Sequence, residues 1–472
     1  MPSTAIVWLR RDLRLADNPA LDQARRSHDR VVPVFIWDPD AEGHWSPGAA
    51  SRWWLHHSLA ALDERLRQRG SRLILAHGDS LEALRRISRA CHADAVYWNR
   101  CYEPALVERD RRIKIALRDR DGLEVESANG SVLFEPWQLR KSDGGVYRVF
   151  TPFWKQMQRH WIVPAVRPEP RRLAPPARWP VSLALDELKL LPRLDWAGGF
   201  SERWEPGETG AGRRLRGFVE QTVIDYAQGR DRPGIAGTSG LSPHLHFGEV
   251  SPWQVARALD DAGELPTGQG ALTFMSEIAW REFSIQMLFH CQELPDKPLN
   301  SSFDRFPWRG QKDYADDLRA WQRGETGIPL VDAGMRELWT TGWMHNRVRM
   351  VVASFLTKNL LIPWQEGARW FWDTLVDADL ANNTQGWQWT AGCGADAAPY
   401  FRVFNPVLQG EKFDPDSTYV RAWCPELASI KGKRIHQPLD REASARLGYP
   451  APIVNLKRSR QRALDAWQQI RA

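Results

Sequence analysis

The sequence predicts an α/β unit with a doubly wound, mostly parallel sheet, followed by a second unit that is all helical. Short apolar, β-branched runs alternate with helical patterns through the first 130 residues. Eight prolines interrupt the stretch 151–192, and strand patterns nearly vanish after residue 201. A chain of 472 residues is long enough for more than one domain. We therefore expect an α/β domain over 1–130, an extended connector over 131–200 and a helical domain over 201–472.

Five runs in the first unit have the composition of buried strands, at 5–9, 31–37, 72–76, 95–99 and 123–127. Amphipathic patterns between them predict helices at 50–68, 80–91 and 105–118, and Gly70 follows the first of these as at a helix C-terminus. No Gly-x-Gly-x-x-Gly follows the first strand, where the chain reads Trp8-Leu9-Arg10-Arg11-Asp12. An ordinary dinucleotide-binding half is therefore disfavoured.

The helical unit is predicted from apolar residues at helical spacing over 272–289, 331–339, 346–361 and 366–376. Twenty-five tryptophans against eight tyrosines are an unusual balance. A buried indole fills core space and usually needs a partner for its N–H group. We expect most of these tryptophans to be structural and a minority to take part in chemistry.

Composition limits the class of protein. The net charge of +6 and the pI near 9.1 favour a polyanionic partner. Five cysteines without Cys-x-x-Cys spacing indicate neither a disulfide framework nor a zinc site, and they suit a reducing interior. The sequence shows no secretory signal, membrane span, His-Glu-x-x-His, Gly-x-Ser-x-Gly or P-loop. We expect a soluble cytoplasmic protein that binds no metal.

A loop rich in glycine and hydroxyl groups spans residues 229–243. Its backbone N–H groups and the hydroxyls of Thr238, Ser239 and Ser242 suit a phosphate. A plain turn with Ser242 as the N-cap before Pro243 explains the same residues equally well. The sequence alone leaves both interpretations open.

Glu277, Trp280 and Arg281 are three and four residues apart, so on a helix they share one face. A carboxylate, an aromatic plane and a guanidinium together suit hydrogen bonding and stacking to a nucleobase. The simpler alternative is a solvated ion pair between Glu277 and Arg281 on a surface helix.

The most informative stretch is 344–393, where polar side chains lie among tryptophans. The side chains concerned are Asn346, Arg349, Asp377, Asp379 and Asn383. Buried charge is costly unless it is paired, so an Arg349–Asp377 pair would indicate that a polar cofactor ring is held there. A buried structural ion pair is the alternative. His345 by itself is explained as an ordinary core histidine.

Together these segments resemble the photolyase and cryptochrome family, and within it the microbial photolyases that repair cyclobutane pyrimidine dimers. The likeness covers almost the whole chain and includes the long motifs WLRRDLR at 8–14, TGIPLVDAGMR at 326–336 and FNPVLQGEKF at 404–413. It implies that the first unit is an antenna domain and that the helical unit holds FAD in a folded, U-shaped form.

The same likeness implies a set of site residues. The flavin contacts are Tyr226, Thr238, Ser239, Leu241, Ser242, Phe274, Arg281, Asn346, Arg349, Asp377, Asp379 and Asn383. The pocket for a flipped dimer is lined by Glu277, Trp280, Asn346, Arg347, Met350 and Trp389, and Arg230 and Gln409 help to hold the DNA. Related enzymes for (6-4) photoproducts carry histidines where this chain has Asn346 and Met350, which disfavours that substrate.

The implied reaction is driven by light. Reduced FAD, excited by blue light directly or through an antenna pigment, donates an electron to the dimer, which splits into two pyrimidines before the electron returns. Glu277 would stabilise the dimer anion through a hydrogen bond. Trp387, Trp364 and Trp308 match a chain of three tryptophans that passes electrons from the surface to the flavin during photoreduction.

Relatives use a folate or a deazaflavin as antenna, and we expect methenyltetrahydrofolate, with deazaflavin as the alternative. Glu103 is either a pigment ligand or a charge at a helix N-terminus. The main rival to the enzyme is a cryptochrome-type blue-light receptor with little or no repair. Asn383 disfavours it, because plant cryptochromes carry Asp at the matching place facing flavin N5, and so does the lack of a C-terminal extension. We expect a monomer associated with the nucleoid through DNA.

Overall fold

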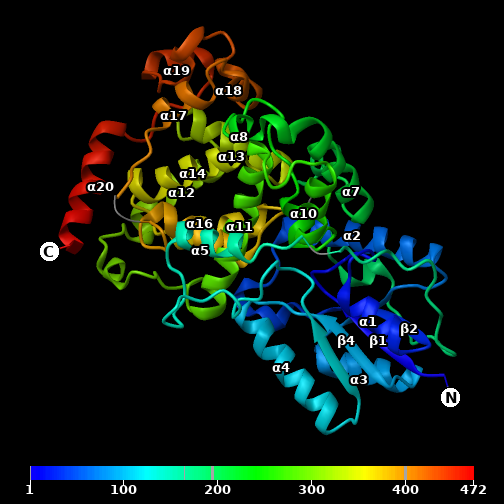
Figure 1. The fold of residues 1–472 in the computed structure, drawn as a ribbon. Helices are drawn as coiled ribbons and strands as arrows, with labels where there is room; N and C mark the ends of the chain where they lie inside the picture. The colour runs from blue at the N-terminus through cyan, green and yellow to red at the C-terminus, as the bar shows by residue number, and fades with distance from the viewer. Residues whose placement is uncertain (1, 164, 193–195, 398–400, 472) are drawn as a thin grey trace.

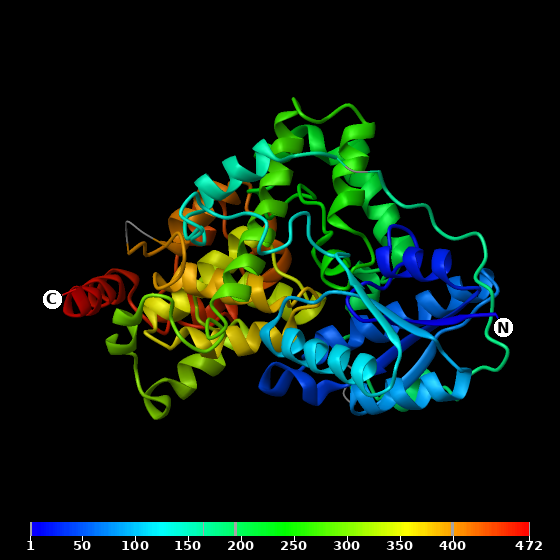
Figure 2. The same ribbon diagram turned by 60° about the horizontal axis from the view of Figure 1, so that its bottom comes forward.

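The computed structural model describes residues 2–163, 165–192, 196–397 and 401–471. An α/β unit, drawn mainly in blue and cyan, lies beside a larger unit of helices drawn from green to red (Figure 1). The two ends of the chain lie on opposite sides of the molecule in both views (Figure 2). The predicted fold class is confirmed, because a parallel sheet precedes a helical unit.

The sheet has five strands: β1 (Thr4–Leu9), β2 (Arg30–Trp37), β3 (Ile74–His77), β4 (Ala95–Asn99) and β5 (Glu124–Ala128). Their order is β3-β2-β1-β4-β5, and every neighbouring pair is parallel. In the register, Ala5 of β1 lies opposite Val31 of β2 and Ala95 of β4. All five predicted strands are confirmed, with ends that move by at most two residues.

Helices cover both faces of this sheet. Successive side chains of a strand point to opposite faces, so Val7 packs with α1 (Pro19–Ser27) and α2 (Ala49–Gln68). Trp8 packs on the other side with α3 (Ser80–Cys91) and α4 (Pro104–Asp119). The doubly wound arrangement therefore follows from strands that are apolar on both faces.

In the first 200 residues, the α-helices α1 and α5 (Phe150–Arg159) were not predicted from the sequence. In α1, the Asn18 side chain caps the first turn and Pro19 takes the first helical position. The segment α5 (Phe150–Arg159) lies inside the predicted extended connector, so that prediction is wrong for these residues. Phe153 and Met157 of α5 are buried, and the Phe153 ring packs on Phe283 with centroids 5.5 Å apart. Connector residues 164 and 193–195 lie outside the described residues, and the domain limits stay a prediction.

The second unit is helical throughout its described part. Its helices are α6 (Phe200–Arg203), α7 (Glu208–Gly217), α8 (Tyr226–Gly229), α9 (Ser242–His246), α10 (Pro252–Asp261), α11 (Gln269–His290), α12 (Gln311–Arg323), α13 (Pro329–Thr341), α14 (Asn346–Ser354), α15 (Trp364–Thr374), α16 (Leu380–Ala391), α17 (Pro406–Phe413), α18 (Thr418–Trp423), α19 (Arg441–Leu447) and α20 (Leu456–Arg471). The helix predicted over 346–361 ends earlier, because α14 passes into a π-helical turn at Phe355–Asn359. Among the helices described, none is long and apolar enough to span a bilayer.

Buried polar groups join the two units just beyond β1. The Arg14 guanidinium is fully buried and donates to the carbonyl oxygens of Gly248 at 2.8 Å and Gly130 at 2.6 Å. It also donates to the Asp17 carbonyl at 2.7 Å. Gly130 follows β5, whereas Gly248 belongs to the helical unit. One side chain therefore satisfies carbonyl groups from three segments that lie far apart in the sequence.

We predict that Arg14→Met lowers the free energy of unfolding by about 4 kcal/mol, because three buried carbonyl groups lose a charged donor. Urea unfolding midpoints of the two proteins would measure the loss. Arg26→Met is the matched control: the Arg26 side chain is exposed, and its partner Asp22, 3.0 Å away, is buried but keeps a second pair with Arg25 at 2.7 Å. Removal of Arg26 should therefore cost about 0.5 kcal/mol or less. Equal midpoints for Arg14→Met and the natural chain would contradict this account of the junction.

Candidate functional site

Eleven of the candidate residues lie on three helices, α11, α14 and α16. The helix α11 carries Phe274, Glu277, Trp280 and Arg281; α14 carries Asn346, Arg347, Arg349 and Met350; and α16 carries Asn383, Trp387 and Trp389. The helix α16 contacts both α11 and α14. Residues as far apart in the sequence as Phe274 and Trp389 therefore share one region of the fold.

The Arg349–Asp377 pair forms as the sequence suggested. A guanidinium nitrogen of Arg349 lies 2.8 Å from an oxygen of Asp377, whose side chain is 3% exposed. Arg349 also donates through Nε to the Met344 carbonyl at 2.7 Å. Two partners therefore fix the orientation of the Arg349 guanidinium. A fixed orientation is what a group that faces a ligand requires.

A second, partly buried acid lies just before α16. Asp379 accepts the backbone N–H of Asn382 at 2.9 Å as the N-cap of this helix. Burial acts to raise its pKa, but His246 and Arg281 oppose this, and the pKa of Asp379 lies below its usual range. Burial lowers the pKa of His246, whose Nδ1 lies 3.5 Å from Asp379. Asp379, His246 and Arg281 line the same small cavity.

The loop 229–243 folds back tightly on itself. A Cβ atom on Gly237 would lie 2.4 Å from the Gly229 carbonyl oxygen, so only glycine allows this approach. Ser242 does not cap α9 with its side chain; its hydroxyl instead accepts a hydrogen bond from Trp343 Nε1 at 3.3 Å. The Ser239 hydroxyl accepts the Leu241 N–H at 3.3 Å. The expectation that Ser242 is the N-cap is therefore wrong.

Two aromatic candidates lie next to this loop. The rings of Tyr226 and Phe274 meet edge to face with centroids 5.3 Å apart, and both side chains are buried with Leu241 in one cluster. Burial raises the pKa of the Tyr226 phenol. Thr238 lies in the loop and is partly exposed.

The charged residues of the predicted lesion pocket are paired with other segments. Glu277 accepts a hydrogen bond from Arg230 at 2.5 Å, and Arg347 pairs with Asp231. Arg281 donates to the Ser131 carbonyl at 2.8 Å. The alternative in which Glu277 pairs with Arg281 on a surface helix is therefore wrong, because each has another partner.

The two tryptophans of the predicted pocket are linked through neighbouring side chains. Trp280 stacks on Phe150 with ring centroids 3.8 Å apart. Trp389 Nε1 donates to the Asp396 carbonyl at 3.1 Å, and the Asp396 carboxylate accepts the Phe150 N–H at 3.3 Å. The helix α5 and the loop after α16 therefore fix where both indoles lie.

The remaining pocket residues are less closely connected. Asn346 is exposed at the first position of α14, and Met350 follows one turn later. Gln409 is partly exposed on α17, and no side-chain hydrogen bond joins it to another candidate within the described residues. The same helix approaches the pocket through Phe413, whose ring lies 4.4 Å from the Arg347 guanidinium.

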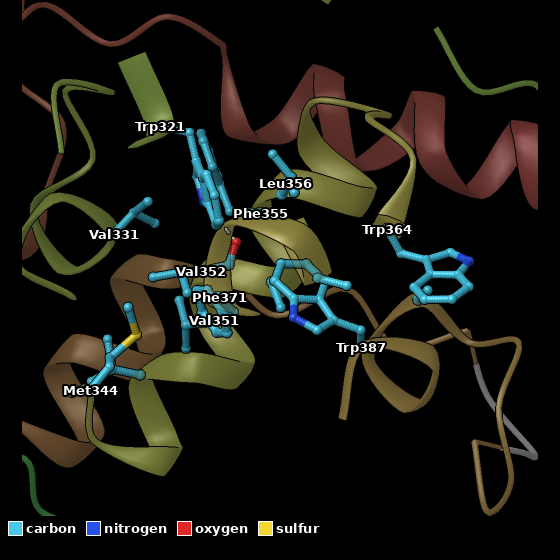
Figure 3. Packing of buried hydrophobic residues seen from close by; sticks show 14 of the residues in the cluster. Trp321, Val331, Met344, Val351, Val352, Phe355, Leu356, Trp364, Phe371 and Trp387 are labelled. Atoms are coloured by element: carbon cyan, nitrogen blue, oxygen red, sulfur yellow. Dashed lines mark hydrogen bonds between the residues drawn. The ribbon is translucent and has the colours of Figure 1, made fainter. Parts of the chain in front are cut away.

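The three tryptophans expected to carry electrons belong to one apolar cluster. Trp387 and Trp364 are each 2% exposed, and Figure 3 shows both among the buried side chains. Trp308 lies at the margin of the cluster and packs on Phe306 with centroids 4.4 Å apart. Trp387 contacts the rings of Phe371 and Trp321, so in the described part of the chain no two of the expected three form a ring pair.

These residues fit a bound dinucleotide with a flavin ring. Two buried imidazole nitrogens, His246 Nδ1 and His345 Nε2, have no hydrogen-bond partner among the described residues. Asn383 donates its amide hydrogen to the Ala368 carbonyl at 3.0 Å, so its amide oxygen faces the other way. The loop 229–243 offers backbone N–H groups and hydroxyls of the kind that a phosphate requires, and the oriented Arg349 guanidinium offers donors of the kind that a polar ring requires.

The structure adds residues that the sequence did not single out, namely Phe150, Asp231, His246, Trp343 and Asp396. Four of them contact a predicted site residue from a segment distant in sequence, whereas Asp396 contacts Trp389, which is 7 residues away. Trp343 and Asp231 carried a local signal, since the first directly precedes the charged stretch 344–350 and the second lies in the loop 229–243.

Two family models match the chain: DNA photolyase over residues 5–172 and the FAD binding domain of DNA photolyase over residues 274–469. A deoxyribodipyrimidine photo-lyase of Agrobacterium fabrum is 48% identical over 99% of this chain and 98% of its own length. Cryptochrome-2 of Arabidopsis thaliana is 39% identical over 100% of this chain and 80% of its own length.

Among solved structures, a bacterial class III photolyase from Agrobacterium tumefaciens superposes with a TM-score of 0.94. It is 48% identical and covers 100% of this chain and 98% of the solved one. The matches run through the sheet and the helices alike, and the resemblance read from the motifs is confirmed. The chain belongs to the photolyase and cryptochrome family.

Proposed function

We propose that this protein is a deoxyribodipyrimidine photo-lyase, a flavoprotein that uses blue light to split cyclobutane pyrimidine dimers in DNA. The observation that carries the proposal is the meeting of α11, α14 and α16, where polar and indole side chains suited to a nucleobase lie beside the Arg349–Asp377 pair. A relative named deoxyribodipyrimidine photo-lyase is 48% identical to this chain, and a relative named cryptochrome is 39% identical.

We propose FAD as the cofactor, held between the loop 237–242 and the helix α16. When bound and reduced, it supplies the light-driven electron that splits the dimer. Backbone N–H groups and hydroxyls of the loop would bind its phosphates. Arg349 and Asp379 would orient the ring system, because the first offers fixed N–H donors and the second an ionised acceptor. Asn383 would present its amide oxygen toward the ring.

The pocket residues would hold the flipped dimer and the strand around it. Trp280 and Trp389 offer indole faces for stacking, and Glu277 offers a carboxylate that accepts the N–H of a thymine base. Arg230 and Arg347 are paired with Glu277 and Asp231 in the protein described here. When DNA binds, exchange of these carboxylates for phosphates would place both guanidinium groups on the backbone.

We propose Trp387, Trp364 and Trp308 as the chain that returns an electron to the flavin when it has become oxidised. Burial of Trp387 and Trp364 and partial exposure of Trp308 support this order from inside to surface. We also propose that the protein acts as a monomer in the cytoplasm and associates with the nucleoid through DNA, for which the basic pI of about 9.1 is the supporting observation.

For the antenna pigment we propose methenyltetrahydrofolate, with a deazaflavin as the alternative. Glu103 lies just before α4 and pairs with Arg11, which also contacts Glu42 at 2.7 Å. A pigment that uses Glu103 as a ligand would have to share it with Arg11. Absorption and fluorescence of the pigment released from the purified protein would distinguish the two compounds.

The proposed function predicts light-dependent recovery of the ultraviolet absorbance of an oligothymidylate that contains cyclobutane dimers. The protein would be loaded with FAD, chemically reduced and illuminated with blue light, and a sample kept in the dark would be the control. Recovery only under light supports the photo-lyase. Binding of the damaged strand without recovery under light would contradict it and favour a cryptochrome-type receptor or a flavoprotein that is governed by redox state alone.

We predict that Glu277→Ala lowers the quantum yield of repair about tenfold while changing the affinity for damaged DNA about threefold or less, since it removes one contact at the reacting base. Yield per absorbed photon and dissociation constants would be measured on the same oligonucleotide. Glu293→Ala removes an exposed carboxylate paired with Lys297 at 2.6 Å and serves as control. An unchanged yield in Glu277→Ala would remove this side chain from the reaction.

We predict that Trp387→Phe slows the light-driven reduction of oxidised flavin by about tenfold or more, equivalent to about 1.4 kcal/mol or more in barrier. Repair by chemically reduced protein should remain as in the natural chain, since the lesion contacts are untouched. Trp137→Phe is the control, because Trp137 is 44% exposed and lies on the connector. Normal photoreduction in Trp387→Phe would show that electrons take another route.

A further inference from the structure

The helix α14 begins with an unusual cap. Its N-cap residue is His345, and the Nδ1 atom of this side chain accepts the backbone N–H of Arg347 at 3.2 Å. Ser, Thr, Asp and Asn are the residues usually found at this position. His345 is only 2% exposed, so its imidazole is buried in the core and also caps the helix.

The cap requires one particular form of the imidazole. A ring nitrogen that accepts a hydrogen bond carries no proton, so Nδ1 must be bare and the proton must lie on Nε2. The ring must also be neutral, because a protonated histidine has two donors and no acceptor. A positive charge at a helix N-terminus would in addition oppose the helix dipole.

The surroundings favour the neutral form. The charged or titratable groups that face His345 are Arg230 and Asp231 from the segment after α8, Glu337 from α13, and Arg347 and Arg349 from α14 itself. Burial, reinforced by the arginines, lowers the pKa of His345 to about 4. The Glu337 carboxylate accepts the His345 backbone N–H at 3.2 Å and the Tyr419 hydroxyl at 2.7 Å, and these bonds hold the residue in place.

We infer that His345 is a positioning residue: its neutral imidazole fixes the first turn of α14, and so places the flavin- and lesion-facing side chains that this turn carries. Asn346 and Arg347 are the first two residues of the helix, and Arg349 and Met350 follow on its next turn. Without the cap, the first turn frays, and any ligand must order it again on binding. The inference rests on the proposed function for what these side chains bind.

Two amide substitutions separate the cap from every other role of the ring. In His345→Asn, the amide oxygen replaces Nδ1 and can accept the Arg347 N–H. In His345→Gln, the longer side chain places its polar group near the position of Nε2 and caps poorly. Both variants are polar, uncharged and close to the natural side chain in volume, so they carry a similar risk of misfolding.

We expect His345→Gln to bind dimer-containing oligothymidylate about 3- to 30-fold more weakly, the range that corresponds to a lost cap, and to retain less FAD after gel filtration. His345→Asn should stay within about twofold of the natural chain in both measurements. If His345→Gln keeps the affinity and FAD retention of the natural chain and His345→Asn does not, the ring acts through Nε2, and the inference is overturned. If His345→Gln and His345→Asn lose affinity and FAD to the same extent, capping is not the role of His345, and the inference is likewise overturned.

A pH series gives an independent readout. The folded-state pKa lies below the ordinary value near 6.5, so the neutral ring contributes stability above that value and the contribution falls as pH drops from about 6.5 toward 4. The thermal midpoint should therefore decline less between pH 7.5 and 5 in His345→Asn than in the natural chain. His160→Asn alters an exposed histidine at the end of α5 and is the control. Parallel declines for all three proteins would contradict the inference.

These readouts remain informative if the proposed function fails. Absence of light-dependent repair in the natural chain would remove the photo-lyase, while FAD retention and the pH series would still decide whether His345 caps α14. Normal repair by the natural chain, together with equal effects of His345→Asn and His345→Gln, would support the proposed function and contradict only the capping role of His345.

Discussion

The buried guanidinium of Arg14 is the constraint on which the arrangement of the two units depends. Within the part of the chain that the structure describes, it donates only to backbone carbonyl groups, and no carboxylate lies at hydrogen-bond distance from its charge. Such a group is tolerated only where all its donors are satisfied. The requirement fixes the relative positions of the β1 end, the β5 end and Gly248, and a Cβ on Gly248 would come within 2.1 Å of the Arg11 carbonyl oxygen.

This junction is continuous with the candidate site. Glu249, the residue after Gly248, accepts hydrogen bonds from Trp54 of α2 at 2.9 Å and from the Gly207 N–H at 2.8 Å, and it pairs with His244 of α9. The helix α9 follows directly on the loop 237–242 proposed to hold phosphate. The sheet unit therefore supports the candidate site, because it helps to fix the position of the loop 237–242 relative to α11 and α16.

The sequence predicted the strands well, because β-branched runs buried on two faces have a distinct pattern that depends on local residues alone. It also placed Glu277, Trp280 and Arg281 on one helical face. It did not find the partners, since local spacing allowed a Glu277–Arg281 pair while the folded chain joins Glu277 to Arg230. The helix α5 was missed for the same reason: its apolar face is stabilised by contact with α11, and its proline at position 152 resembled a breaker. Contacts between distant segments decide the partner of Glu277 and the formation of α5, and the residues of one segment alone do not reveal those contacts.

The many tryptophans follow from the same need to join distant segments. Indole N–H groups of buried tryptophans reach backbone carbonyl groups elsewhere, as Trp321 does to Val352 at 3.1 Å and Trp204 to Thr341 at 2.8 Å. Each such residue fills a large volume and satisfies one polar group. Trp387 is placed differently, because a Cβ on Gly367 would come within 2.0 Å of its ring. Gly367 therefore defines the position of the Trp387 indole, which is proposed to lie nearest the flavin. Both core packing and the proposed electron transfer would require that position 367 has no side chain.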